Sequence, residues 1–169
     1  MFDKFGEFDS YEELNKAAEG LKEEGDRESL KELAKENGID VEDAVDYIDG
    51  VTDMLTTFRT ASIGKLEIEA TALSLPDDIL ISDWVNQVKT YVMRDDDMCR
   101  AVRRKGKRLI DCLGRILKRS FENQWEVPKD ILKAAGVSAN RVTFGVPSAA
   151  SVNKIIKDYY LEEATGEKE

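Results

Sequence analysis

The strongest candidate for chemistry is a cationic run between positions 100 and 119, where nine Lys and Arg side chains occur with one carboxylate, Asp111. On helices these side chains would form a row of donors suited to phosphate groups. The alternative is a solvated face that pairs with the acidic N-terminal half of the chain. Only Phe121 and Trp125 follow the run, so stacking on single-stranded nucleic acid is not indicated. The candidate phosphate-binding residues are Arg100, Arg103, Arg104, Lys105, Lys107, Arg108, Arg115, Lys118 and Arg119.

A dense acidic segment is the second candidate. Residues 40–53 place six carboxylates around one tyrosine. A helical surface of this kind can occupy a basic groove meant for nucleic acid, because carboxylates can imitate spaced phosphates. The alternative is ordinary solubility and helix capping, which explains Asp40 and Asp43 well. The candidate partner-binding residues are Asp40, Glu42, Asp43, Asp46, Tyr47, Asp49 and Asp53.

Residues 128–142, PKDILKAAGVSANRV, are the third candidate. They resemble the first helix and turn of a helix-turn-helix motif, which would present Asn140 and Arg141 to a major groove. Gly145 and Pro147 would cut the second helix to about one and a half turns. The alternative is therefore an ordinary helix that ends at a glycine cap.

The sequence lends weak support to an enzyme. It has no histidine, no glycine-rich phosphate loop and no nucleophile motif, so zinc sites and histidine acid–base catalysis are excluded. The two cysteines, Cys99 and Cys112, lie 13 positions apart and are expected to be free thiols without a role. We expect no enzyme activity, no cofactor and no metal, and a metal site built only of Asp and Glu stays a remote alternative.

Charge is distributed unevenly along the 169 residues, whose net charge is −10. Residues 1–50 carry 17 acids and 6 bases, and residues 51–97 carry 9 acids and 4 bases. Residues 98–160 reverse the sign, with 5 acids and 14 bases. Such asymmetry favours a charged partner on at least one side, or attraction between the two parts within the fold.

Capping residues and apolar periodicity predict an all-α fold, a compact multi-helix bundle with a small acidic N-terminal three-helix unit and at most one short hairpin. Ser10 and Asp40 are expected to cap helices, Asp95, Asp96 and Asp97 together to open another, and Asp77 and Asp78 to favour the start of a further one. The expected helical ranges are 10–25, 27–37, 40–50, 51–75, 77–92, 95–105, 107–122, 129–135 and 147–161.

Two segments leave the secondary structure open. Gly64 could divide the helix predicted over 51–75, and the alternation in 65–70 makes a short strand there a live alternative. Residues 142–147 predict a turn or a brief extended piece, so any strand is expected at 65–70 or 142–146. The helix over 107–122 is the clearest amphipathic one, with one apolar face made of Leu109, Ile110, Leu113, Ile116, Leu117 and Phe121.

The expected organisation is an acidic helical unit over 1–50, a main helical domain with the basic helices over 51–161, and a frayed acidic tail over 162–169. No apolar run is long enough to span a membrane, and the first residues lack the pattern of a signal peptide. We therefore expect a protein of the cytoplasm that has no membrane partner.

Four stretches together resemble a family of small proteins from mobile elements of Gram-positive gut bacteria. That family consists of anti-CRISPR inhibitors of the type II-A RNA-guided DNA nuclease, and it overlaps a family of PcfK-like conjugative-plasmid proteins. The resemblance covers most of the chain and is weakest over 51–80. The stretches are FDSYEELNKAAEGLKEEGD (8–26), LKELAKENGIDVEDAVDYIDG (30–50), AVRRKGKRLIDCLGRILKRSF (101–121) and VPKDILKAAGVSANRVTFGVPSAASVNKIIKDYY (127–160).

The resemblance implies a non-enzymatic inhibitor that binds the nuclease stoichiometrically and blocks cleavage of target DNA in the cytoplasm of a bacterial host. Charge placement adds that the acidic unit would contact basic nuclease protein, and that the basic helices would contact guide RNA or bound DNA. The alternative function is a nucleic-acid-binding accessory or regulatory protein of a conjugative element, which would use residues 98–144.

Overall fold

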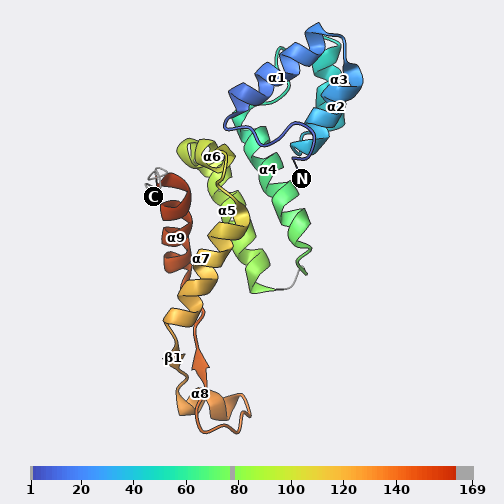
Figure 1. The fold of residues 1–169 in the computed structure, drawn as a ribbon. Helices are drawn as coiled ribbons and strands as arrows, with labels where there is room; N and C mark the ends of the chain where they lie inside the picture. Colours follow the sequence, from blue (N-terminus) through green and yellow to red (C-terminus); the bar gives the residue numbers. More distant parts are fainter. Residues whose placement is uncertain (1, 77–78, 163–169) are drawn as a thin grey trace.

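The computed structural model describes residues 2–76 and 79–162, and the all-α prediction is confirmed within them (Figure 1). These ranges contain nine helices and one two-stranded sheet. The predicted start at Asp77 and Asp78, most of the predicted tail and the first residue lie outside the described residues. The elements are α1 (Tyr11–Glu23), α2 (Arg27–Glu36), α3 (Val41–Ile48), α4 (Phe58–Leu73), α5 (Leu80–Arg94), α6 (Asp96–Arg103), α7 (Leu109–Glu122), β1 (Trp125–Glu126), α8 (Lys129–Ala134), β2 (Thr143–Phe144) and α9 (Ala149–Leu161).

Three helix starts form at the predicted caps. The Ser10 hydroxyl accepts a hydrogen bond from the Glu13 N–H, and Asp40 accepts one from the Glu42 N–H. Asp95 accepts from the N–H groups of Asp97 and Met98. Each bond satisfies a donor that the first turn of a helix leaves unpaired, so these starts are encoded locally.

Helices α1–α3 form the small acidic unit, with its own apolar cluster built around Leu14, Leu30, Leu33 and Ala44. Two residues beyond the expected boundary at position 50, Leu55 and Ala61, belong to the same cluster. The unit is therefore not closed by residues 1–50 alone. It is completed by the chain that enters α4, as expected for a unit too small to bury a sufficient core.

The main body consists of α4–α7 and α9 around a second cluster that includes Trp84, Val88, Ile116, Ile156 and Tyr160. Helix α4 packs on α5, α6 and α7 and also on α1, so it belongs to both parts (Figure 1). Among the described residues, no helix is both long enough and apolar enough to cross a membrane.

The helix predicted over 51–75 is confirmed for 58–73, and its first part is wrong because residues 51–57 are not helical. The two alternatives left open do not occur: 65–70 is helix rather than strand, and α4 runs unbroken through Gly64. The physical reason is a close approach: a Cβ at Gly64 would lie 2.5 Å from the carbonyl oxygen of Asn37 and 2.6 Å from that of Gly38. Position 64 requires a glycine because a backbone turn lies against α4 there, and the glycine does not mark the end of the helix.

Helix α7 leads into a protruding segment, residues 123–147, which we call the arm (Figure 1). In the arm β1 pairs antiparallel with β2, with Trp125 opposite Phe144. Strand β2 confirms the strand expected within 142–146, whereas β1 lies outside both segments where a strand was expected. A Cβ at Gly145 would lie 1.9 Å from the Ser120 carbonyl oxygen, so a glycine is required where the returning chain meets α7. Over 123–147, all of which the structure describes, Leu132 is the one buried side chain.

Candidate partner-binding surfaces

The acidic candidates lie on α3 and the loop after it. All six carboxylates are exposed at the surface of the acidic unit. Asp40 is the cap of α3, and Asp49 forms an ion pair with Arg27 at 2.8 Å. The chain therefore uses two of the six for its own structure. The four that remain are Glu42, Asp43, Asp46 and Asp53.

Tyr47 does not belong to that surface, which corrects the prediction. Its ring is buried in the apolar cluster of the acidic unit, and the ammonium of Lys22 lies 4.1 Å from the ring centroid. The same Lys22 donates a hydrogen bond to the Tyr47 carbonyl oxygen at 2.6 Å. Burial raises the pKa of the Tyr47 hydroxyl. Tyr47 therefore lies on the side of α3 that faces the core, whereas the neighbouring carboxylates lie on the side that faces solvent.

The basic candidates do not form one continuous stripe. Arg103 is 2% exposed and donates a hydrogen bond to the side-chain oxygen of Asn37 at 2.7 Å. The prediction that Arg103 lies on the surface is therefore wrong. It lies on the inner side of α6, where it joins this helix to the end of α2. Burial lowers the pKa of Arg103, and the charges of Glu7 and Glu69 oppose that shift.

Several other cations of the run are held by the chain itself. Lys107 donates to the carbonyl oxygens of Tyr159 and Glu162 at the end of α9. Arg108 forms a two-point pair with Asp111, and Arg115 pairs with Glu162 at 3.1 Å. Lys118 lies 3.7 Å from Glu122. Much of the run therefore pairs within the fold, but these partners lie in the C-terminal part of the chain and not in the acidic N-terminal half that the alternative expected.

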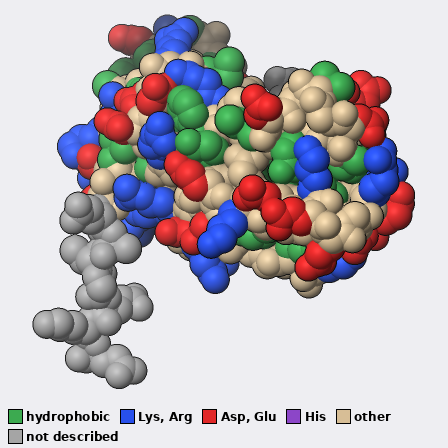
Figure 2. Space-filling model, turned by 90° about the horizontal axis from the view of Figure 1, so that it is seen from above, with side chains coloured by type: hydrophobic (Ala, Val, Ile, Leu, Met, Phe, Trp, Pro, Cys, Tyr) green, Lys and Arg blue, Asp and Glu red, His purple; other side chains and the backbone are tan. Residues whose placement is uncertain are grey.

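Three cations of the run, Arg104, Lys105 and Arg119, are exposed and have no carboxylate partner among residues 2–76 and 79–162. They are the part of the predicted phosphate-binding set that is most open to a ligand. Viewed from the end that holds α1–α3, acidic and basic side chains alternate over the surface and form no patch of one sign (Figure 2).

The helix-turn-helix interpretation is wrong, because its second helix does not form. Residues 137–142 are not helical, and the next helix is α9, which starts at Ala149. Gly136, with a φ of +67°, ends α8, and the chain then turns back to pair β2 with β1. Asn140 and Arg141 are exposed in this loop, and Arg141 pairs with Glu126 at 3.3 Å.

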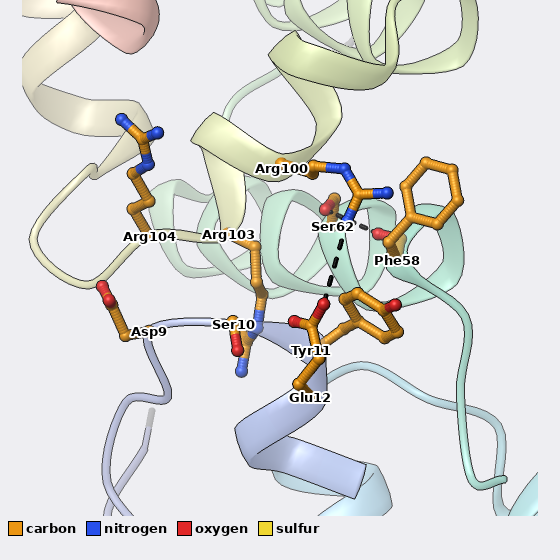
Figure 3. Close-up of a pocket in the computed structure, with 9 residues that line it drawn as sticks. All are labelled: Asp9, Ser10, Tyr11, Glu12, Phe58, Ser62, Arg100, Arg103 and Arg104. Carbon is orange, nitrogen blue, oxygen red and sulfur yellow. Dashed lines mark hydrogen bonds and ion pairs between the residues drawn. The ribbon is translucent and has the colours of Figure 1, made fainter. Parts of the chain in front are cut away.

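A pocket of about 230 Å³ at the junction between α1, α4 and α6 was not foreseen from the sequence (Figure 3). Arg100 extends across it toward Glu12, 3.8 Å away, and its guanidinium lies 4.6 Å from the centroid of the Phe58 ring. Arg103 points past Ser10, and Arg104 points away from the other labelled side chains. Glu12 pairs with Arg100, whereas the Nε and Nη1 atoms of Arg103, which also lines the pocket, are buried without a hydrogen-bond partner among the described residues.

Buried charges lie beside this pocket and join the two parts of the molecule. The fully buried ammonium of Lys65 contacts Glu7 at 2.6 Å and the Arg104 carbonyl oxygen at 2.9 Å. The other oxygen of Glu7 accepts from the Gly106 N–H, and Glu69 accepts from the Leu109 N–H at 2.7 Å. Burial lowers the pKa of Lys65, although its hydrogen bond to Glu7 opposes the shift. The network holds the loop before α7 in place.

The sequence offered little signal for this network. Lys65 and Glu69 fall on a predicted helix four residues apart, a spacing that is common on solvated surfaces. Their burial depends on the N-terminal residues lying over α4, which local patterns do not encode. Both cysteines are free and buried, and burial raises the pKa of Cys112 to about 12. The described residues contain no cluster of three potential metal ligands.

Comparison with known proteins identified no similar protein. No protein-family model, no curated protein and no solved structure matches the chain.

Proposed function

We propose that the protein is an anti-CRISPR inhibitor, which binds the type II-A RNA-guided DNA nuclease and blocks cleavage of target DNA in the bacterial cytoplasm. The observation that carries the proposal is a group of four exposed carboxylates on α3 and the following loop. In the described part of the chain no cation neutralises them. They are Glu42, Asp43, Asp46 and Asp53.

The chemistry of the target supports this choice. Nucleases of this type hold the guide–target duplex in a positively charged channel and read a short DNA motif through arginines. A rigid helix that presents carboxylates can compete for such a groove, because it supplies the negative charge that DNA would supply. The sequence resemblance to anti-CRISPR proteins points to the same target. An inhibitor of this kind acts by occupancy and needs no catalytic group.

A cleavage assay with purified nuclease, guide RNA and target DNA tests the proposal. The wild-type protein should stop cleavage at near-stoichiometric ratios. The triple variant Asp43→Lys, Asp46→Lys, Asp53→Lys should weaken inhibition about tenfold or more, because each surface ion pair contributes about 0.2–1 kcal/mol and charge reversal adds repulsion. Asp49 stays unchanged because it holds Arg27.

A matched control carries the same change in net charge outside the acidic unit. The variant Asp83→Lys, Asp97→Lys, Asp130→Lys replaces three exposed acids of α5, α6 and α8 that hold no ion pair among the described residues. It should inhibit as the wild type does. If both variants keep their helical signal and both still inhibit at near-stoichiometric ratios, the acidic surface is not the contact. Absence of inhibition by the wild type would reject the function itself.

A nucleic-acid-binding accessory protein of a conjugative element is the second candidate, and the exposed Arg104, Lys105 and Arg119 favour it. Such a protein should bind bare duplex DNA at low salt, with an affinity that falls steeply as salt rises. Reversal of these three residues to Glu should flatten that dependence by about one unit of slope for each phosphate that the variant no longer binds. DNA binding without nuclease inhibition would select this candidate.

The same reversal also separates two modes of inhibition. If the basic residues touch guide RNA or bound DNA, the variant should bind the guide-loaded nuclease more weakly and the bare nuclease protein as tightly as before. Arg108 and Arg115 are left unchanged, because Asp111 and Glu162 already hold them.

A further inference from the structure

Arg103 is a buried charge that the fold leaves largely unsatisfied. Its side chain is 2% exposed, and it forms no ion pair among residues 2–76 and 79–162. A guanidinium carries five N–H donors, yet in the described fold one side-chain hydrogen bond is made, from Nη2 to Asn37. The Nε and Nη1 atoms are buried without a partner. Burial of charged donors in this way costs free energy unless an acceptor is supplied.

The space that can hold this acceptor is the pocket of about 230 Å³ between α1, α4 and α6. Arg103 is one of its lining residues, and its side chain runs from α6 toward Ser10 at the start of α1 (Figure 3). Tyr11 and Glu12, the first two residues of α1, line the pocket as well. The N–H groups of a first helical turn have no partner within the helix, and they attract negative charge. The helix start and the buried guanidinium therefore favour the same kind of ligand, an anion.

The charges around the pocket indicate how much charge that anion carries. Four exposed charged residues line it, two acidic and two basic, so their charges cancel. They are Asp9, Glu12, Arg100 and Arg104. The buried Arg103 then leaves the lining with one net positive charge. A second negative charge on a ligand would find no matching cation, so the lining favours a singly charged anion.

The rest of the lining includes two aromatic rings. The rings of Tyr11 and Phe58 are tilted at 57° with centroids 6.0 Å apart. The Arg100 guanidinium lies 4.6 Å from the Phe58 centroid and 5.8 Å from that of Tyr11. Small-molecule sites commonly combine aromatic surface of this kind with a few polar groups that fix the ligand. These rings favour a ligand that has an apolar body beside its anionic group.

We infer that this pocket binds a small organic carboxylate, whose oxygens accept hydrogen bonds from the buried Arg103 and whose apolar body lies against Tyr11 and Phe58. A carboxylate is singly charged, and its charge-assisted bonds to a guanidinium are about twice as strong as neutral ones. The bound ligand would join α1 of the acidic unit to α4 and α6 of the main body. This binding does not depend on the nuclease, so its failure would leave the proposed function unaffected.

Calorimetric titration and thermal melting of the full chain with benzoate, at constant ionic strength, provide the first test. Benzoate should bind saturably and raise the melting temperature, because a ligand of the folded state stabilises that state. Benzamide, which has a similar shape without the charge, should do neither. Inorganic phosphate, which lacks the apolar body and carries more charge, should bind more weakly than benzoate.

Two substitutions at exposed residues of the lining should change the affinity in opposite directions. Glu12→Gln raises the net charge of the lining and should lower the benzoate dissociation constant about two- to fivefold, whereas Arg100→Gln should raise it by a similar factor. The matched control Arg119→Gln removes an exposed cation of α7 outside the pocket and should bind benzoate as the wild type does. All three positions are exposed, so the helical signal should stay unchanged.

Arg103→Lys tests the buried donors themselves. Lysine keeps the charge but lacks the Nε and Nη1 donors, so benzoate should bind about tenfold more weakly or worse. If this variant does not fold, Glu12→Gln and Arg100→Gln still decide the question, because both change residues at the surface.

Four outcomes would overturn the inference. The first is a wild-type chain that does not bind benzoate. The second is equal binding of benzamide, which would make the pocket an apolar cavity without preference for an anion. The third is tighter binding of phosphate than of benzoate, which would exclude a carboxylate as the preferred ligand. The fourth is an equal effect of Arg100→Gln and Arg119→Gln, which would show that net charge alone matters and that the ligand lies elsewhere.

Discussion

Gly64 shows at the scale of one residue why the two parts of the molecule lie so close. It is in the middle of α4, where glycine costs about 0.5–1 kcal/mol relative to alanine, yet no break follows. The backbone of the turn at Asn37 and Gly38 lies against the α-carbon of Gly64. Gly38 itself has a φ of +69°. Two glycines therefore meet where two backbones touch.

We expect Gly64→Ala to lower the free energy of unfolding by about 1–3 kcal/mol or more, because the new methyl group would overlap two backbone carbonyls that cannot move aside. Urea denaturation followed by circular dichroism measures the change. Gly20→Ala in α1 is the matched control, since its Cβ meets nothing within 4 Å and alanine is the better helix former. It should stabilise the protein. Equal effects of both substitutions would disprove the close approach.

Glu69 is the second residue whose environment leads to a prediction. Burial raises its pKa above the ordinary value of 4.5, while its bond with the Leu109 N–H and the charge of Lys65 oppose the shift. In the window above pH 4.5 the folded protein therefore retains a proton that the unfolded chain releases. The free energy of unfolding attributable to this group falls as pH rises through that window.

The variant Glu69→Gln should remove this component. Its stability relative to the wild type should therefore rise as the pH increases from 4.5 toward neutrality. Denaturation curves at a series of pH values measure the difference. Glu42→Gln, which changes an exposed carboxylate without an ion-pair partner among the described residues, should leave the slope of the wild type unchanged. Parallel curves for the wild type and Glu69→Gln would show that Glu69 is not buried as described.

At the scale of elements, α7 and the arm differ in how much they contribute to the core. Helix α7 buries Leu109, Leu113 and Ile116 on one side. It leaves Ile110, Leu117 and Phe121 exposed on the other. The arm contributes little to either core cluster, since almost all of its side chains are exposed or half-buried and Leu132 alone within 123–147 is buried. A segment with few buried contacts opens at low free-energy cost and is suited to binding rather than to holding the fold.

The two tryptophans allow a direct comparison of these roles. Trp84, on α5, is in the core cluster, whereas Trp125, on β1, mainly meets Phe144. Trp84→Ala should lower the free energy of unfolding by about 3–5 kcal/mol, and Trp125→Ala by less than about 1 kcal/mol. Urea titration of both variants tests this pair. A large cost at Trp125 would mean that the arm packs on the body in solution.

At the scale of the whole molecule, the fold depends on charges that bridge its two parts. Glu7 of the N-terminal segment reaches the buried Lys65 of α4 and the loop before α7. Among the described residues, Arg100 and Glu12, 3.8 Å apart, form the one ion pair that joins the basic stretch over 98–160 to the acidic stretch before it. The remaining exposed carboxylates and cations are what the proposed function uses.

Glu7→Ala should lower the free energy of unfolding by about 3–5 kcal/mol, because Lys65 would be left as an unpaired charge in the interior. Amide hydrogen exchange should also accelerate at residues 104–108, which Glu7 holds through Gly106. Glu32→Ala removes a carboxylate that pairs with Lys4 at the surface and should cost less than about 1 kcal/mol. Similar costs for the two variants would argue against a buried network.

Local signals in the chain were enough to predict most helices with their caps and stops, because a Ser or Asp cap and a glycine stop act on the neighbouring turn. They also located the strand within 142–146, but not its partner strand over 125–126. The side of each helix that meets water became clear only from the packed molecule. Arg103 and Tyr47 looked like surface residues and are buried, while Leu117 and Phe121 looked like core and are exposed. Gly64 looked like a helix break and is a contact point. The physical reason is the same in each case: exposure depends on segments distant in the sequence, and their packing is set by the whole chain.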